Sequence, residues 1–223
     1  MIFKWRKNKK GDYPEYWQNY INTFLSKPVA GIEDTTFVVF DTETTGFDFN
    51  KDRILCIGAL KLKGNDIEIG NVFERYIQQE HFNPKTVEIH GILKENTAYD
   101  SEEDAIVDFL AYLENAVIVA HHAYFDITMI NYALKRLGLP KLKNKVIDTG
   151  VLYRKTRISS HLIEQEKNYT LDELADLMHI SKKDRHTALG DAYITALVFL
   201  KTLSKLKKGH QMTLKQLLKL VKY

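Results

Sequence analysis

Residues 36–46 are Thr36-Phe37-Val38-Val39-Phe40-Asp41-Thr42-Glu43-Thr44-Thr45-Gly46, an apolar run that ends in two carboxylates. The β-branched and aromatic residues at 36–40 predict a buried strand. Asp41 and Glu43 lie two residues apart at its end, so their side chains point to the same face of the sheet. Thr44-Thr45-Gly46 is expected to turn the chain away. The segment thus predicts a pair of acids fixed at the end of a strand.

The pattern of elements on either side indicates an α/β fold. Residues 53–63 and 67–76 are two further strand candidates, and Gly64-Asn65-Asp66 between them is a hairpin signal. Short apolar runs predict a fourth strand at 117–120 and a fifth at 146–148. Helical spacing and capping signals predict helices at 16–25, 101–114, 125–137, 170–178 and 188–206. This order describes a mixed five-stranded sheet flanked by helices.

Two more acids and a histidine complete a candidate site. Asp126 begins a helix just after the fourth strand, and Asp191 lies in the apolar helix 188–206, where a carboxylate needs a partner. Acids that converge repel one another unless cations lie among them, which suggests a two-metal site for phosphodiester chemistry. On one continuous helix His186 would lie roughly 140° from Asp191, so we expect it in the preceding loop or first turn. A mobile loop suits a general base.

Each of these features alone is more often structural: an Asp-x-Glu pair is commonly a turn or cap, and most histidines are not catalytic. Their joint occurrence, in order, resembles the DnaQ-like 3′–5′ exonucleases of the DEDD superfamily, in the histidine-containing DEDDh branch that is similar to the DNA polymerase III epsilon exonuclease domain. Three segments carry the resemblance: Asp41 to Gly46, His121-His122-Ala123-Tyr124-Phe125-Asp126, and His186-Thr187-Ala188-Leu189-Gly190-Asp191-Ala192. Softer matches are Ile89-His90-Gly91-Ile92, and Ile147-Asp148-Thr149 followed by Arg154. The resemblance covers about residues 34–205.

The resemblance implies an RNase H-like fold and a metal-dependent mechanism. Asp41, Glu43, Asp126 and Asp191 would hold two Mg²⁺ or Mn²⁺ ions, whose preference for oxygen ligands suits carboxylates. His186 would accept the proton of a metal-bound water. By position, the residues that bind the terminal nucleotide would be Thr44, Gly46, Phe47, His122 and Phe125, with Phe47 as a wedge against the last base.

His122 departs from the family pattern, which usually has asparagine at this position. Histidine still forms hydrogen bonds, but it is bulkier and titrates near neutral pH. Two interpretations stay open: a changed nucleotide selectivity or pH optimum, and a nearby histidine with little effect.

Composition excludes several classes of protein. The 223 residues carry a net charge of +3 with 44% hydrophobic residues, which is ordinary for a globular chain. The single cysteine, Cys56, excludes an intramolecular disulfide and lies in an apolar run, so we expect a buried thiol. No apolar run approaches the roughly 18 residues of a membrane span, and no export signal follows the basic N-terminus. A cytoplasmic location without membrane contact is the expectation.

The chain divides into three predicted parts: a basic tail with an aromatic helix at 1–32, the exonuclease domain at 33–206, and a basic amphipathic segment at 207–223. Leu214, Leu217, Leu218 and Val221 form one apolar stripe in the last part. Such a stripe most often packs on its own domain. The alternative is that the terminal segments dock a DNA polymerase or another replication partner.

Three functional hypotheses follow from the sequence. The first is a 3′–5′ exonuclease that acts on single-stranded or frayed DNA ends in proofreading or repair and releases nucleoside monophosphates. The second keeps the fold but trims RNA or degrades oligoribonucleotides, because the motifs do not distinguish DNA from RNA. The third is a non-catalytic nucleic-acid-binding or polymerase-binding module. Four mutually repelling acids argue against the third, since without metals they would weaken phosphate binding.

Overall fold

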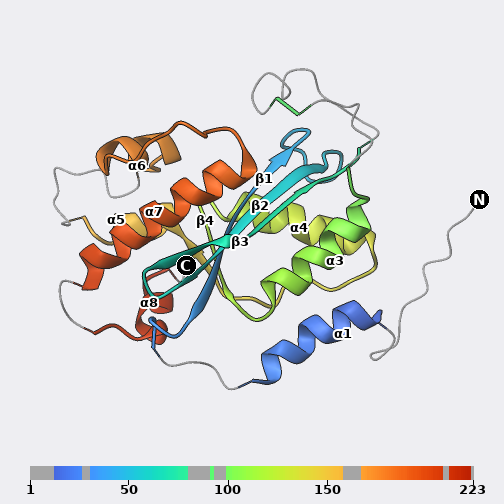
Figure 1. Ribbon diagram of the computed structural model, residues 1–223, viewed down its shortest axis with the longest axis horizontal. Helices are drawn as coiled ribbons and strands as arrows, with labels where there is room; N and C mark the ends of the chain where they lie inside the picture. Colours follow the sequence, from blue (N-terminus) through green and yellow to red (C-terminus); the bar gives the residue numbers. More distant parts are fainter. Residues whose placement is uncertain are drawn as a thin grey trace, which may run out of the picture.

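The fold is built on one mixed sheet, seen in a computed structural model that describes residues 13–26, 31–79, 91–92, 99–157, 167–207 and 211–221. The five strands lie in the order β3-β2-β1-β4-β5 (Figure 1). β1 pairs antiparallel with β2 and parallel with β4; β2 pairs antiparallel with β3, and β4 pairs parallel with β5. Their bounds are β1 Thr36–Thr44, β2 Ile54–Lys63, β3 Asp66–Tyr76, β4 Val117–Ala120 and β5 Val146–Asp148. The predicted α/β architecture, a mixed five-stranded sheet flanked by helices, is confirmed.

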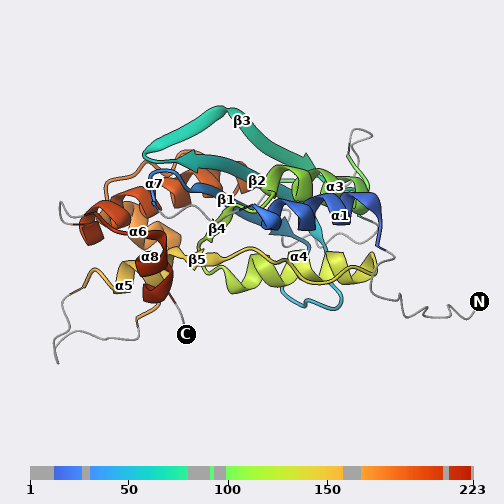
Figure 2. The ribbon, with the colours of Figure 1, turned by 90° about the horizontal axis from the view of Figure 1, so that it is seen from below.

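Helices cover both faces of this sheet (Figures 1 and 2). The first face carries α1 Glu15–Asn22, α3 Glu102–Leu113 and α4 Tyr124–Arg136, and the second carries α5 Thr149–Arg154, α6 Leu171–Leu177, α7 Ala188–Lys207 and α8 Leu214–Leu220. Strand alternation in β1 divides its side chains between the two cores. Val38 and Phe40 pack with the first group of helices, whereas Phe37 and Val39 pack with α7 and α8.

Most expected elements are found within two residues of their predicted ends. β1 extends further than its apolar run, to Thr44, because the backbone of Asp41 and Glu43 still pairs with β2. The first helix is shorter than predicted, since Thr23–Leu25 tightens into a 3₁₀ turn. The short helix α5 was not predicted; Asp148 caps it by accepting from the backbone N–H of Val151 at 3.1 Å. Cys56 is buried, as expected.

Both terminal helices pack on the sheet layers. Trp17 and Tyr20 of α1 are buried against the first core, and the Tyr20 hydroxyl donates to Asn144 Oδ1 at 2.5 Å. Leu217 of α8 is fully buried beside Phe199 in the second core. The apolar stripe of the C-terminal segment therefore packs on its own domain, and Leu217 is not available to a partner. The division into three parts stays a prediction, and residues 1–12 and 222–223 lie outside the described residues.

In the part of the chain that the structure describes, no helix combines the length and apolar character needed to cross a membrane.

Candidate active site

The first two acids lie on β1, on the face that α7 covers. Asp41 and Glu43 are both partly exposed, whereas Thr42 and Thr44 between and after them are buried. This alternation follows from the strand geometry that their spacing predicts. Carboxylate oxygens of Asp41, Glu43 and Asp191 lie within 4.8 Å of one another. The structure therefore brings together three of the four predicted acids closely enough for one cation.

A glycine on the neighbouring strand allows this convergence. Gly58 of β2 is the register partner of Asp41. A Cβ atom at Gly58 would lie 2.1 Å from the backbone nitrogen of Leu189 and 2.3 Å from the carbonyl carbon of Ala188, closer than real Cβ atoms approach. The first turn of α7 thus rests on the bare backbone of β2. Asp191, also in that first turn, reaches Asp41 because nothing separates helix from strand here.

Arg185 supplies a positive charge inside the acid cluster. Its guanidinium bonds to Asp172 of α6 through two contacts, Nε to Oδ1 at 2.9 Å and Nη2 to Oδ2 at 3.0 Å. Its third nitrogen, Nη1, donates to Asp191 Oδ2. These hydrogen bonds hold the pKa of Asp172 below its usual range. Arg185 therefore offsets part of the repulsion among the acids and ties the segment before α7 to α6.

Asp126 approaches the cluster from the other side of β1. It lies in the first turn of α4, and its Oδ1 accepts from the Thr42 backbone N–H at 3.0 Å and from the Thr42 hydroxyl at 2.7 Å. Asp126 is not one of the three acids that fit around a single ion. Its charge nevertheless raises the pKa of Asp41, so electrostatically it belongs to the same group.

Burial and mutual repulsion strongly perturb these acids. Burial is the main cause that raises the pKa of Glu43 to about 7, with the charges of Asp191 and Asp126 adding to it and Arg185 opposing it. Burial likewise raises the pKa of Asp126 to about 7, against the hydrogen bonds from Thr42. The pKa of Asp41 is raised well above its usual range for the same reasons. A divalent cation is the ligand that such a group of hard oxygen donors fits, and Mg²⁺ and Mn²⁺ are the usual choices.

His186 lies in a turn before α7, as its spacing from Asp191 predicts. Its φ of +65° is in the left-handed region, and its side chain is exposed. The backbone N–H of His186 donates to Asp191 Oδ1 at 3.3 Å. Gly190 permits this turn to fold back, since a Cβ there would lie 1.9 Å from the carbonyl oxygen of Asp184. Asp191 thus fixes the backbone of His186, the residue expected to act as the general base.

A second group of predicted residues surrounds a pocket of about 300 Å³ beside the N-terminus of α4. His122 and Phe125 line it together with Arg154, and Arg154 Nη1 donates to Asn168 Oδ1 at 2.7 Å. The backbone φ of His122 is +53°, a conformation for which asparagine and histidine are both enriched. The position thus accepts histidine in place of the usual asparagine without a change in the backbone.

His121 has a different environment from its neighbour. Its ring stacks on His122 with centroids 4.2 Å apart, and its Nδ1 lies 2.9 Å from the hydroxyl of Thr149. Burial, and then the neighbouring His122, lower the pKa of His121 to about 4. His121 is therefore neutral at physiological pH and unsuited to act as a cationic phosphate ligand.

The loop after β1 presents Phe47 to solvent. Thr44 donates from its hydroxyl to the carbonyl oxygen of Gly46 at 2.9 Å, and Asp52 packs so closely on Gly46 that a Cβ would lie 2.5 Å from its Oδ2. The Phe47 side chain is 79% exposed, with its ring centroid 5.6 Å from that of Phe125. The ring of Phe47 is therefore exposed beside Phe125, and its role as a wedge stays a prediction.

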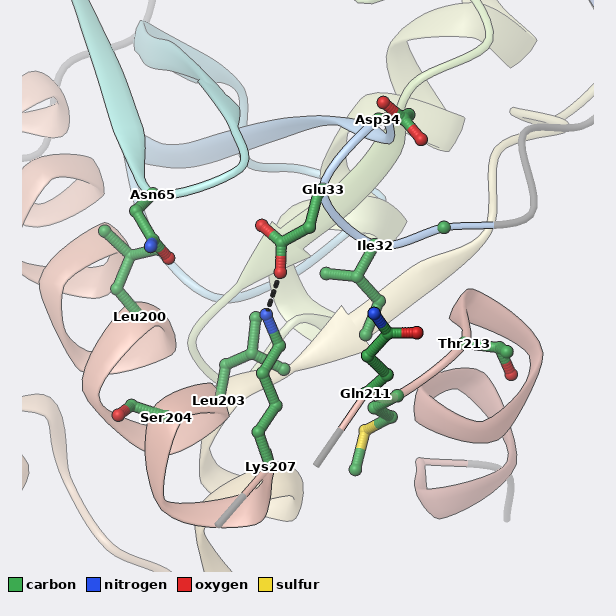
Figure 3. A pocket seen from close by; sticks show the side chains of 12 residues that line it. Ile32, Glu33, Asp34, Asn65, Leu200, Leu203, Ser204, Lys207, Gln211 and Thr213 are labelled. Carbon is green, nitrogen blue, oxygen red and sulfur yellow. Dashed lines mark hydrogen bonds and ion pairs between the residues drawn. The ribbon is translucent and has the colours of Figure 1, made fainter. Parts of the chain in front are cut away.

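A pocket of about 720 Å³ lies away from the acids, between the end of α7 and the segments around residues 31 and 212 (Figure 3). Glu33 and Lys207 form an ion pair across it, and Leu203 contributes to its apolar wall. None of the residues predicted for catalysis lines this pocket. This pocket is therefore not the candidate reaction site, despite its volume.

Sequence reasoning missed three residues that shape the site: Gly58, Arg185 and Asp172. Gly58 interrupts an apolar strand, and a glycine in a strand is a recognised sign of close backbone approach. Arg185 directly precedes His186, but no local pattern links it to Asp172. The structure alone brings these two side chains together. Residues 89 and 90 of the softer match at 89–92 lie outside the described residues.

Comparison with known proteins agrees with this geometry. The exonuclease family RNase_T matches residues 38–199. The PolC-type DNA polymerase III of Caldanaerobacter subterraneus subsp. tengcongensis is 36% identical over 180 residues, 77% of this chain and 12% of the relative. The corresponding protein of Bacillus subtilis is 35% identical over 176 residues, again 77% and 12%. The chain therefore spans only about an eighth of the length of these relatives.

Solved structures share the fold. Exonuclease X in complex with 5′ overhanging duplex DNA superposes with a TM-score of 0.62 at 22% identity, over 83% of this chain and 99% of the other. Escherichia coli Exonuclease I in complex with a dA16 oligonucleotide gives a TM-score of 0.64 at 18% identity, over 83% of this chain and 42% of the other. At these identities the similarity establishes the architecture.

Proposed function

The chain belongs to the RNase T exonuclease family, and from that premise we propose that it is a metal-dependent 3′–5′ exonuclease acting on single-stranded or frayed DNA ends. The observation that carries the proposal is the convergence of Asp41, Glu43 and Asp191 within 4.8 Å, beside the turn that bears His186. A module that only binds nucleic acid has no use for a group of acids whose pKa values are raised by burial and mutual repulsion. A phosphodiesterase gains a cation site from them.

Asp41, Glu43 and Asp191 would hold one divalent ion, and Asp126, through the oxygen that Thr42 leaves free, would help to hold a second. Two such ions would lower the pKa of a bound water and would stabilise the departing 3′ oxygen. Thr42 fixes the Asp126 carboxylate by its two hydrogen bonds and favours the ionised form. Arg185 holds the segment that carries His186 against α6.

His186 is the proposed general base. Its side chain is exposed, and the hydrogen bond from its backbone N–H to Asp191 keeps the residue beside the acid cluster. His179 provides a matched control, because it is also exposed, in a turn, with a φ of +53°. We expect His186→Ala to lower kcat by roughly 10²–10⁴-fold and His179→Ala to leave it unchanged.

The terminal nucleotide would lie between the loop after β1 and the start of α4. Phe47 and Phe125 offer aromatic faces for stacking on a base, and His122 offers a ring nitrogen for a hydrogen bond. Thr44 and Gly46 shape the loop that presents Phe47. This assignment follows the matched motif positions and is supported by their shared location.

An assay with oligonucleotides labelled at either end tests the activity and its direction. A 3′-labelled single strand with Mg²⁺ should release labelled mononucleotide at once, and a 5′-labelled strand should shorten stepwise. Asp41→Ala should remove both signals, and EDTA should do the same to the wild type. Equal turnover by wild type and Asp41→Ala would refute the assignment.

Proofreading or repair of DNA is the proposed setting. The PolC-type relatives are DNA polymerases by name, and structures with the same fold were solved with DNA. Competition between DNA and RNA oligomers of the same sequence tests the choice of substrate: if the RNA is consumed faster, the RNA-trimming alternative is right. Co-purification with a polymerase tests the proposed association.

A further inference from the structure

We propose that a groove along the outer side of α4 binds the single-stranded part of the substrate, several nucleotides away from the scissile bond. The groove has a volume of about 520 Å³ and is lined by Phe49, Tyr124, Tyr132, Lys135, Leu139 and Lys141, among others. None of these residues is among those assigned above to the metal ions, the general base or the terminal nucleotide. This inference rests on the proposed function, because it concerns the path of the same nucleic acid strand.

Aromatic rings connect the groove to the active site without interruption. Phe125, next to the acid Asp126, has its ring centroid 5.6 Å from that of Phe47 and 5.7 Å from that of Phe49. Phe49 in turn stacks on Tyr132 at 5.9 Å with an interplanar angle of 29°. A strand whose terminal base lies at Phe47 therefore meets further aromatic faces as it leaves the site.

One ring of the groove, that of Tyr124, is exposed, whereas Phe49 is partly buried and packs on the first core. The Tyr124 side chain is 76% exposed although it lies only two residues before Asp126 on α4. It lines both the groove and the pocket of His122, so the two cavities share a wall. Large aromatic side chains left in the open beside a nuclease site are the usual stacking platforms for unpaired bases.

The charge of the groove fits a polyanion. Lys135 and Lys141 line it, and no Asp or Glu is among the described residues that do so. The Nζ of Lys135 lies 5.2 Å from the centroid of the Tyr132 ring, which places a cation beside an aromatic face. An alternation of bases on rings and phosphates near lysines is the pattern of sequence-tolerant single-strand binding.

The length of the groove gives an expected site size. Tyr124 and Tyr132 both lie on α4, about 12 Å apart along its axis at roughly 1.5 Å per residue. At about 3.4 Å per stacked nucleotide, this distance spans three nucleotides. Oligonucleotides too short to leave the active site should therefore be bound more weakly than those that extend along α4.

The test compares substrates of different length in Tyr132→Leu/Lys135→Gln. For wild type we expect KM to fall as oligothymidylates lengthen from dT2 to dT12. In the variant KM for dT12 should rise about 10-fold, the size of one lost stacking contact, and the salt dependence of log KM should weaken by about 0.7 per lost phosphate contact. Hydrolysis of the p-nitrophenyl ester of thymidine 5′-monophosphate, which is too small to enter the groove, should be unchanged.

A matched control comes from a pair of residues on β2 and α3. Lys61 lies over the ring of Tyr112, with Nζ 4.6 Å from the centroid, so Tyr112→Leu/Lys61→Gln removes the same kind of pair elsewhere. It should leave KM for dT12 at the wild-type value. If the α4 variant and this control show the same dependence of KM on length, the groove is not a strand-binding site.

Failure of the groove and failure of the proposed function give different results. A wild type that cleaves neither dT12 nor the p-nitrophenyl ester contradicts the exonuclease assignment. Fluorescence anisotropy with labelled dT12 in Ca²⁺ then still tests the groove. A dissociation constant that rises about 10-fold in the α4 variant supports the proposal, and an unchanged one overturns it.

Discussion

Replacing Gly58 with alanine should separate the acids, because the methyl group would lie between β2 and the first turn of α7. The added Cβ would lie 2.1 Å from the backbone nitrogen of Leu189, where ordinary contact begins at 3.4 Å. The helix must therefore retreat by about 1 Å, and Asp191 moves with it, away from Asp41. Neither neighbour can yield as a flexible side chain would, since both are backbone.

The expected losses follow from this displacement. Overpacking of this kind lowers the free energy of unfolding by about 1–3 kcal/mol. A misplacement of about 1 Å at a reacting centre reduces turnover roughly 10²-fold. Mn²⁺ affinity should also fall, since Asp191 would no longer lie within 4.8 Å of the acids on β1. Urea unfolding, oligonucleotide turnover and calorimetric titration with Mn²⁺ measure the three effects.

Gly70→Ala provides the control. Gly70 is also a strand glycine, on β3, but a Cβ there would meet nothing within 4 Å. It should leave turnover and Mn²⁺ affinity unchanged and stabilise the protein slightly, because alanine restricts the unfolded chain. If Gly58→Ala keeps wild-type turnover and Mn²⁺ affinity, the argument that bare backbone positions Asp191 is wrong.

Three further predictions concern the charges of the site. Arg185→Gln should lower the free energy of unfolding by roughly 3 kcal/mol at pH 8 in EDTA, and by less in excess Mg²⁺, because the ion replaces the lost charge. The matched variant Arg136→Gln breaks the ion pair with Glu102 between α3 and α4, and its loss of unfolding free energy should be the same in EDTA and in Mg²⁺. Equal effects of Mg²⁺ on the two variants would contradict this prediction. Thr42→Val removes the hydroxyl that donates to ionised Asp126 and leaves the bond from the backbone N–H in place, so the pKa of Asp126 rises further and the acidic limb of the kcat/KM profile should move up by about one pH unit; an unmoved limb counts against it. The folded-state pKa values of Glu43 and Asp126 are raised to about 7, so their contribution to stability is fully present below their usual pKa values near 4 and is lost as pH rises through 7. Urea midpoints measured in EDTA should therefore fall from pH 5 to pH 8. A flat profile would refute the raised pKa values.

Local patterns in the sequence were sufficient to predict the strands and most helices. The apolar run before Asp41, the hairpin signal at Gly64 and the capping box at Thr170 each act within a few residues, and each is found in the structure. The helix α5 was not predicted because it is short and because its N-cap, Asp148, is also the last residue of β5. Asp148 also accepts at 2.9 Å from the backbone N–H of Ala123, which follows the neighbouring strand β4, and no local sequence pattern predicts such a bond.

The candidate site was predictable as a set of residues but not as an arrangement. Strand alternation requires Asp41 and Glu43 to share a face, and the helical angle places His186 off the α7 axis, so both could be derived from spacing. The approach of Asp191 could not, because it depends on Gly58 in another strand and on the absence of a side chain there.

Arg185 makes the same point for electrostatics. Three buried or half-buried acids with raised pKa values destabilise a fold unless something offsets them, and the protein does so partly with a guanidinium bonded to both Asp172 and Asp191. That cation also opposes the rise in the pKa of Glu43. A divalent ion that binds Asp191 must compete with it. We therefore expect Arg185, which precedes the proposed base and would not itself bind metal, to weaken metal binding. Arg185→Gln should bind Mn²⁺ more tightly than wild type, by about the 10-fold that one displaced charge-assisted hydrogen bond represents.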